Sequence, residues 1–167
     1  MRFDHRTALI TGAGSGIGQA TAKILAEHGV DLALLDINAD GLAATEAMLA
    51  HTGRKVLTVV CDVADHASVD AALGKVREAF PRIDILINNA GIFKDNIMKF
   101  HLTDPETWER RWRINVEGTM YITHSLLPAM LEQNSSVGKR SSKYFDRKMK
   151  KVSSSNAQTV GHIPAVN

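Results

Sequence analysis

The sequence predicts an α/β domain in which helices cover both faces of a parallel sheet. Four short apolar runs alternate with stretches of helical periodicity, and a glycine-rich turn directly follows the first run. Parallel neighbours need crossover connections of about a dozen residues or more, which helices supply. We therefore expect a doubly wound sheet that stops after the fourth strand and the helices that follow it.

The apolar runs give the expected strands. They consist largely of Val, Ile, Leu and Ala, which is typical of strands buried on both faces. The strands are expected at Ala8–Ile10, Leu32–Leu35, Val56–Val60 and Ile83–Ile87.

Periodicity and capping residues place the first three helices. The helix after the glycine turn ends at His28–Gly29, residues 39–51 form the second, and Asp65 caps the third. The expected buried face of the first helix comprises Ile17, Ala20, Thr21, Ile24 and Leu25. The expected face of the third comprises Val69, Ala72, Leu73, Val76 and Phe80.

Two more helices are expected after the fourth strand. Asp104–Pro105–Glu106 combines an N-cap, a proline in the first turn and an acidic residue. The helix that begins here carries Trp108 and Trp112, whose spacing predicts one shared face in the core or at an interface. A longer helix over residues 116–131 has the apolar stripe Val116, Met120, Thr123, Leu127 and Met130.

The glycine-rich turn Thr11–Gly18 is the first candidate site. A turn between strand and helix points free backbone N–H groups and the positive end of the helix dipole at one place, which suits a pyrophosphate. The spacing is Thr-Gly-x-x-x-Gly-x-Gly rather than G-x-G-x-x-G, and the alternative is a tight connection without a ligand. The candidate cofactor-binding residues are Gly12, Ser15, Gly16, Ile17 and Gly18.

Asp36 is the second candidate. It ends the second strand, where a doubly wound sheet places a carboxylate that binds the adenosine ribose hydroxyls and repels a 2′-phosphate. Positions that could place a cation nearby carry none: Ala13, Gly14, Ser15, Ile37 and Asn38. The sequence therefore predicts NAD rather than NADP, and the alternative is a surface aspartate that starts a turn.

Composition divides the chain in two. Residues 1–133 are expected to form a Rossmann-type NAD-binding domain. Residues 134–167 carry seven Lys or Arg, one Asp or Glu and seven Ser, and are expected to form a basic, poorly ordered tail. We expect no membrane span, nucleic-acid partner or metal site, and the single Cys61 fits a cytoplasmic setting.

Five segments together resemble the short-chain dehydrogenase/reductase family. Thr11–Gly18, Asp36, Cys61–Val63, Asn88–Gly91 and Asn115 match its motifs in chain order over about residues 6–133, and the stretch after Gly91 is especially similar to the 3-oxoacyl-carrier-protein reductase branch. The resemblance implies that Asp62 and Val63 hold the adenine, and that Asn115 supports a water for proton relay. The residues implied on the nicotinamide side are Asn89, Ala90 and Gly91.

The catalytic residues of the resembled family are a Ser at the end of a fifth strand and a Tyr-x-x-x-Lys pair on the next helix. The candidates here are Ser142, Tyr144 and Lys148. Tyr144 comes only two residues after Ser142, and two residues span at most ~7 Å, which is too short for the intervening loop. We therefore interpret the pair as accidental and the catalytic half as missing or altered, in a truncated or frame-shifted product or in a natural short relative.

Two functions remain open at this point. The first is an NAD(P)-dependent oxidoreductase that transfers hydride between NAD(H) and a small alcohol or carbonyl substrate. The alternative is a non-catalytic dinucleotide-binding fragment or pseudoenzyme with little or no turnover. The open edge of the fourth strand also predicts a homo-oligomer or a self-associating protein.

Overall fold

Four parallel strands form the sheet of the computed structural model, which describes residues 5–93 and 103–133. The strands are β1 (Thr7–Thr11), β2 (Asp31–Asp36), β3 (Val56–Val60) and β4 (Ile85–Ile87). Their order is β3-β2-β1-β4, and every pairing is parallel. The chain winds outward from β1 to β3 and then returns to place β4 on the other side of β1. The predicted doubly wound α/β fold is therefore confirmed.

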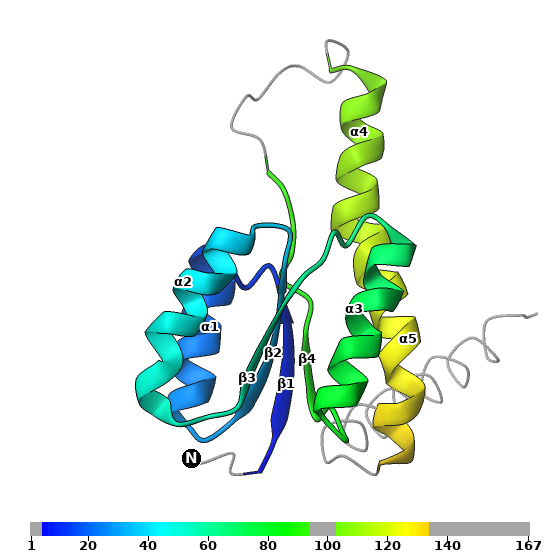
Figure 1. Ribbon diagram of the computed structural model, residues 1–167. Coiled ribbons are helices and arrows are strands. Elements are labelled where there is room, and N and C mark those ends of the chain that lie inside the picture. Colours follow the sequence, from blue (N-terminus) through cyan, green and yellow to red (C-terminus); the bar gives the residue numbers. More distant parts are fainter. Residues whose placement is uncertain (1–4, 94–102, 134–167) are drawn as a thin grey trace, which may run out of the picture.

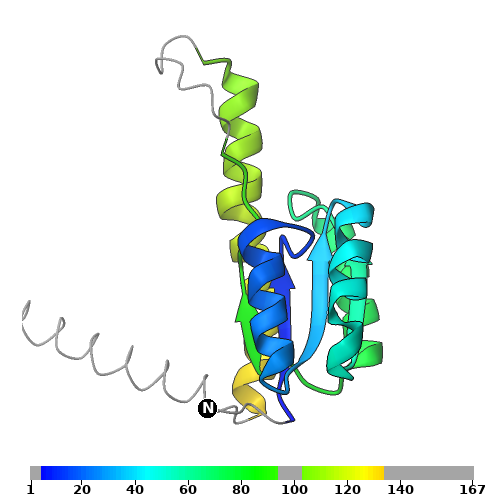
Figure 2. The same cartoon turned by 90° about the vertical axis from the view of Figure 1, so that its left-hand side faces the viewer.

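Helices cover both faces of the sheet (Figure 1). Helices α1 (Gly16–Glu27) and α2 (Ala39–Leu49) lie on one face, and α3 (His66–Ala79) and α5 (Gly118–Glu132) lie on the other. A short 3-10 helix, η1, follows α2. Figure 2 shows α1 and α2 in front of the strands and, above them, a helix that extends past the end of the sheet.

That projecting helix is α4 (Pro105–Trp112), which continues through the π-helical segment η3 (Arg113–Glu117) into α5. Asp104 caps α4 by accepting a 3.2 Å hydrogen bond from the N–H of Glu106, as predicted. Trp108 and Trp112 are 39% and 57% exposed, so their prediction as core residues is wrong. The alternative prediction, that the two tryptophans lie at an interface, stays a prediction.

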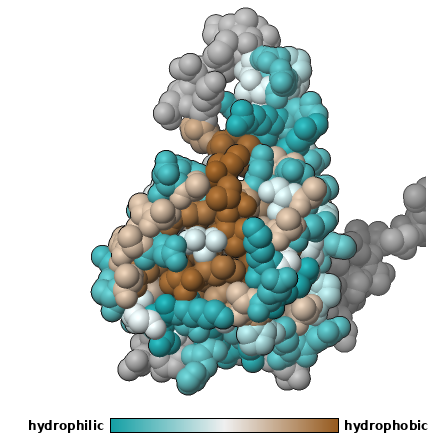
Figure 3. Space-filling view, viewed as in Figure 1, coloured by the Kyte–Doolittle hydropathy of each residue, from teal (hydrophilic) through white to brown (hydrophobic). Residues whose placement is uncertain are grey.

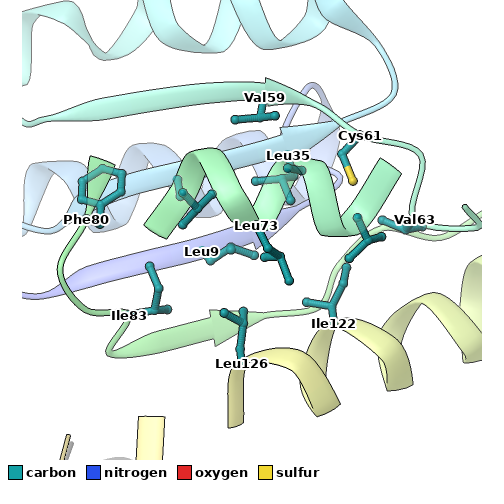
Figure 4. Packing of buried hydrophobic residues seen from close by; sticks show 14 of the residues in the cluster. Leu9, Leu35, Val59, Cys61, Val63, Leu73, Phe80, Ile83, Ile122 and Leu126 are labelled. Carbon is teal, nitrogen blue, oxygen red and sulfur yellow. The ribbon is translucent and has the colours of Figure 1, made fainter. Parts of the chain in front are cut away.

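The core consists of two hydrophobic clusters, one on each face of the sheet. Ala8 and Ile10 of β1 face α1 and α2, whereas Leu9 faces α3 and α5. Figure 4 shows Leu9, Leu73 of α3 and Leu126 of α5 within one cluster. Burial on both faces explains why the strands are apolar without alternation.

The predicted face of α3 is correct, and that of α1 is wrong. Asp65 accepts a hydrogen bond from the N–H of Ala67, and the buried residues of α3 are Val69, Ala72, Leu73 and Val76. In α1 the buried residues are Gly18, Ala22 and Ala26, whereas Ile17 and Ile24 are 78% and 56% exposed. Small residues let α1 approach the sheet closely, and hydrophobicity alone does not reveal that preference.

The predicted stripe of α5 is also wrong, except at its end. Its buried residues are Gly118, Ile122, Leu126 and Met130, whereas the predicted Met120 and Leu127 are 65% and 42% exposed. The helix is apolar on two sides, so periodicity could not tell which side faces the sheet.

Strand β4 begins two residues later than predicted. Ile83 is buried outside the strand, and Asp84, which is fully buried, donates its N–H to the carbonyl of Thr7 at 2.9 Å. No helix within residues 5–93 and 103–133 is both long enough and apolar enough to cross a membrane. The predicted tail, with Ser142, Tyr144 and Lys148, lies outside the described residues.

Candidate functional site

A cleft opens where the carboxyl ends of β1, β2, β3 and β4 meet, at the point where the strand order reverses. The predicted residues that line it are Gly12, Ser15, Asp36, Asp62, Val63, Asn89, Ala90 and Gly91. Gly16, Ile17 and Gly18 form the first turn of the adjoining helix α1. Lining residues that the sequence did not single out for binding are Ile37, Cys61, Ile92, Arg110 and Ile114.

The glycine turn leaves backbone donors without partners at the start of α1. Gly12 and Gly16 have φ values of +66° and +55°, which glycine adopts without strain. The N-cap Ser15 makes no side-chain capping bond, and the first turn holds no acidic residue. The first-turn N–H groups therefore have no partner within the helix and can bind an anion.

Asn89 holds this turn against the end of β4. Its Nδ2 donates to the carbonyl oxygens of Thr11 and Gly12, at 3.1 Å each. In return, Thr11 Oγ1 accepts hydrogen bonds from the N–H groups of Asn89 and Ala90, both at 3.0 Å. A Cβ on Gly18 would overlap the oxygen of Gly12 and lie 2.6 Å from Asn89 Nδ2. Strand end, turn and helix thus form one closely packed unit.

The carboxylate of Asp36 is fixed by two backbone donors. The N–H of Gly14 donates to Oδ2 at 2.8 Å, and the N–H of Asn38 donates to Oδ1 at 2.9 Å. Each oxygen of an ionised carboxylate has two acceptor positions, so one on each stays available. Two adjacent acceptors at the edge of a cleft match the two hydroxyls of a ribose.

The end of β3 contributes the third wall of the cleft. Asp62 Oδ1 accepts a hydrogen bond from the N–H of Ala64, and the N–H of Asp62 donates to Ser68 Oγ. Val63 is 8% exposed, and a Cβ on Gly118 would lie 2.6 Å from its carbonyl oxygen. Because Gly118 has no side chain, α5 packs directly against the backbone of Val63 and supports this wall of the cleft.

The thiol of Cys61 lies beside this wall. Burial raises its pKa, which the hydrogen bond from Ser68 opposes, and the charges of Asp62 and Asp65 raise it further. A thiol with a raised pKa holds little thiolate, the reactive form. We therefore expect Cys61 to be an unreactive residue of the core.

Asn115 lies in the π-helical segment η3, and its side chain makes two hydrogen bonds to the backbone of Ile92. Its Oδ1 accepts the N–H of Ile92 at 2.8 Å, and its Nδ2 donates to the carbonyl of Ile92 at 3.1 Å. Both polar groups of the side chain therefore help to hold the segment after β4. The predicted role of Asn115 in a proton relay stays a prediction, as do those of Ser142, Tyr144 and Lys148.

Comparison with known proteins identifies the family. A family model described as short chain dehydrogenase matches residues 6–139. This chain belongs to the short-chain dehydrogenase family. Oxidoreductase UcpA of Salmonella typhimurium is 39% identical over 132 residues, which are 79% of this chain and 49% of the relative. Levodione reductase of Leifsonia aquatica is 40% identical over 136 residues, 80% of this chain and 51% of the relative.

Solved structures of short-chain dehydrogenases match the fold. Levodione reductase has a TM-score of 0.76 at 39% identity, covering 80% of this chain and 52% of that one. NAD+-bound xylitol dehydrogenase has a TM-score of 0.75 at 34% identity, covering 80% and 51%. L-sorbose reductase from Gluconobacter frateurii, complexed with NADPH and L-sorbose, has a TM-score of 0.74 at 32% identity, covering 79% and 50%.

The matches cover only part of each relative. The chain spans about half the length of the curated relatives that it matches. Both NAD and NADPH occur in structures of the family, so the family alone does not select between them. The similarity to the 3-oxoacyl-carrier-protein reductase branch stays a prediction.

Proposed function

We propose that this chain binds NAD(H) in preference to NADP(H) and contributes the dinucleotide site of an oxidoreductase that acts on a small alcohol or ketone. The observation that carries the proposal is the carboxylate of Asp36, half-buried at the cleft and fixed by Gly14 and Asn38. Membership of the short-chain dehydrogenase family supports the reaction class. When bound, the nicotinamide ring of the dinucleotide accepts or supplies the hydride.

The residues around the cleft fit such a dinucleotide. The unpartnered N–H groups at the start of α1 suit the pyrophosphate, because they add hydrogen bonds to the helix dipole. Asp36 suits the hydroxyls of the adenosine ribose, and the buried Val63 beside Asp62 offers an apolar contact with a polar edge for the adenine. Asn89 to Gly91 follow β4, on the other side of β1 from Asp36, a position that suits the nicotinamide side that the resemblance implied for them.

The preference for NAD(H) follows from charge. Two like unit charges about 5 Å apart repel by about 3 kcal/mol at an effective dielectric constant of about 20, and salt reduces this at an exposed site. A 2′-phosphate would also replace a ribose hydroxyl that can donate to Asp36 with a group that accepts. We therefore expect NADH to bind at least about tenfold more tightly than NADPH, a difference of about 1.4 kcal/mol.

The experiment compares Asp36→Asn with Asp40→Asn. Asp40 is exposed in the first turn of α2 and does not line the cleft, so its substitution removes the same charge from the same region. Fluorescence titrations with NADH and NADPH should show a smaller preference for NADH in Asp36→Asn and an unchanged one in Asp40→Asn. Equal losses of preference in both variants would show that net charge, rather than the Asp36 site, selects the nucleotide.

The names of the relatives support the substrate class. Levodione reductase and a D-threitol dehydrogenase of Mycolicibacterium smegmatis are among the similar proteins, and both names denote alcohol or ketone chemistry. The cytoplasmic setting and the homo-oligomer expected from the sequence stay predictions.

A further inference from the structure

Helix α2 contacts the cofactor turn through two glycine backbones. A Cβ on Gly41, in the first turn of α2, would lie 2.7 Å from the carbonyl oxygen of Gly14 and 3.1 Å from its Cα. A Cβ on Gly14 would in turn lie 3.0 Å from both Cγ and Oδ2 of Asp36. Gly14 is therefore enclosed between Asp36 and α2, and its N–H is the donor that binds Asp36 Oδ2.

Thr45 adds a buried polar contact one turn further along α2. Its hydroxyl shares one donated hydrogen between the carbonyl oxygens of Ala13 at 2.9 Å and Gly41 at 3.0 Å, and its oxygen accepts a hydrogen bond from Gln19 Nε2 at 2.9 Å. The residue is 0% exposed. Ala13 also donates its N–H to the carbonyl of Leu35 in β2. The N–H of Ala13 therefore binds the turn to the sheet, and the carbonyl oxygen of Ala13 binds it to α2.

These contacts determine where the carboxylate of Asp36 points. The carboxylate keeps its orientation only while the N–H of Gly14 stays in place, because Gly14 is one of the two donors that hold it. The position of Gly14 depends on the backbone contact with Gly41 and on the Thr45 bond to the preceding residue. A loosened turn would let the carboxylate rotate away from the ribose and relieve the repulsion of a 2′-phosphate.

We propose that Gly41 and Thr45 are positioning residues that set the selectivity of the site for NAD(H) by holding the segment Ala13–Gly14 against Asp36. The inference rests on the proposed function, since it assigns a second part of the same site. Neither residue lines the cleft, so both act through the turn and not on the ligand. A residue with this role changes the ratio of the two affinities, whereas a residue that only stabilises the fold weakens both equally.

The test measures dissociation constants for NADH and NADPH in Thr45→Val, Thr45→Ser and Thr52→Val. Valine keeps the shape of threonine and removes the hydroxyl, and serine retains it. Loss of one net hydrogen bond is expected to lower the ratio of the NADPH constant to the NADH constant about threefold to tenfold in Thr45→Val. Thr45→Ser should retain most of the ratio. Thr52 donates to the carbonyl of Leu49 beyond the far end of α2, so Thr52→Val should leave the ratio unchanged.

The outcomes separate this inference from the proposed function. A ratio near one in the unmodified chain would contradict the proposed function itself. A high ratio that Thr45→Val leaves unchanged, or lowers no more than Thr52→Val does, would overturn the positioning role alone. If circular dichroism shows that Thr45→Val is unfolded, the same ratio is measured in Gln19→Met instead. This substitution removes the side chain that donates to Thr45, and Gln19 is only half-buried. An unchanged ratio in folded Gln19→Met overturns the inference, and a lowered ratio supports it.

Discussion

Substitution of Asp84 should destabilise the fold more than loss of any exposed charge. Asp84 is fully buried just before β4, where it accepts hydrogen bonds from the N–H of Thr7 at 3.0 Å and from Arg6 at 2.8 Å, and also contacts Arg82. Removing the carboxylate leaves the buried N–H of Thr7 without its acceptor, which costs about 1 to 3 kcal/mol. The two arginine side chains are 32% and 41% exposed, so water can hydrate them once the carboxylate is gone. Asp84→Ala should therefore lose about 1 to 3 kcal/mol of a total stability of about 5 to 15 kcal/mol.

The pH dependence of stability gives the same prediction a second test. Burial alone would raise the pKa of Asp84, but the N–H of Thr7 and the guanidinium groups of Arg6 and Arg82 outweigh it and lower the pKa. The stabilisation is therefore fully present above the unfolded pKa of about 3.9, and is lost as the pH falls through the lower folded value. In Asp84→Ala this part of the acid destabilisation should be absent.

Urea unfolding at pH 7 and at stepwise lower pH measures both effects. The matched control is Glu109→Ala, which removes an exposed carboxylate paired with Arg113 and should cost less than about 0.5 kcal/mol. If Asp84→Ala and Glu109→Ala proved equally stable at pH 7, the buried carboxylate of Asp84 would not support the fold as argued.

Three further predictions concern binding, association and turnover. Gly18→Ala should weaken NADH binding more than about tenfold in fluorescence titrations, because its Cβ meets Gly12 and Asn89 and one well-placed clash costs more than about 1.4 kcal/mol. Gly74→Ala, where nothing lies within 4 Å of the added Cβ, should bind normally, and equal losses would contradict the steric argument. The chain should self-associate at micromolar concentration, because β4 pairs with β1 alone among the described strands, and Figure 3 shows hydrophobic surface between the helical layers at the β3 edge. A clean monomer in light scattering would contradict this. NADH oxidation with a panel of ketones and acyl thioesters should be slow or absent, and robust turnover that Tyr144→Phe abolishes would make Tyr144 a catalytic residue after all.

Local patterns predicted most of the fold. The strands lie within about two residues of their expected positions, because continuous apolar runs between turns leave little choice of register. The faces of α1 and α5 were wrong for a tertiary reason. Close approach to the sheet selects Gly18 and Ala22 in α1, and α5 has apolar side chains on two sides, of which only the one with Ile122 and Leu126 is buried.

The sequence also predicted only part of the candidate site. The turn after β1 and Asp36 at the end of β2 are set by sequence neighbours, so motif spacing was sufficient to select them. Gly41 and Thr45 were missed because they approach the turn from α2, and no local pattern marks that contact. Arg110 reaches the cleft from α4, and only the folded arrangement brings it there.

The most direct test of the central claim is a pair of calorimetric titrations of the unmodified chain, with NADH and with NADPH, at one pH and one salt concentration. The fixed carboxylate of Asp36 and the open start of α1 predict that both nucleotides compete for one site and that NADH binds at least about tenfold more tightly. Tighter binding of NADPH, or no binding of either nucleotide by the folded chain, would contradict the account.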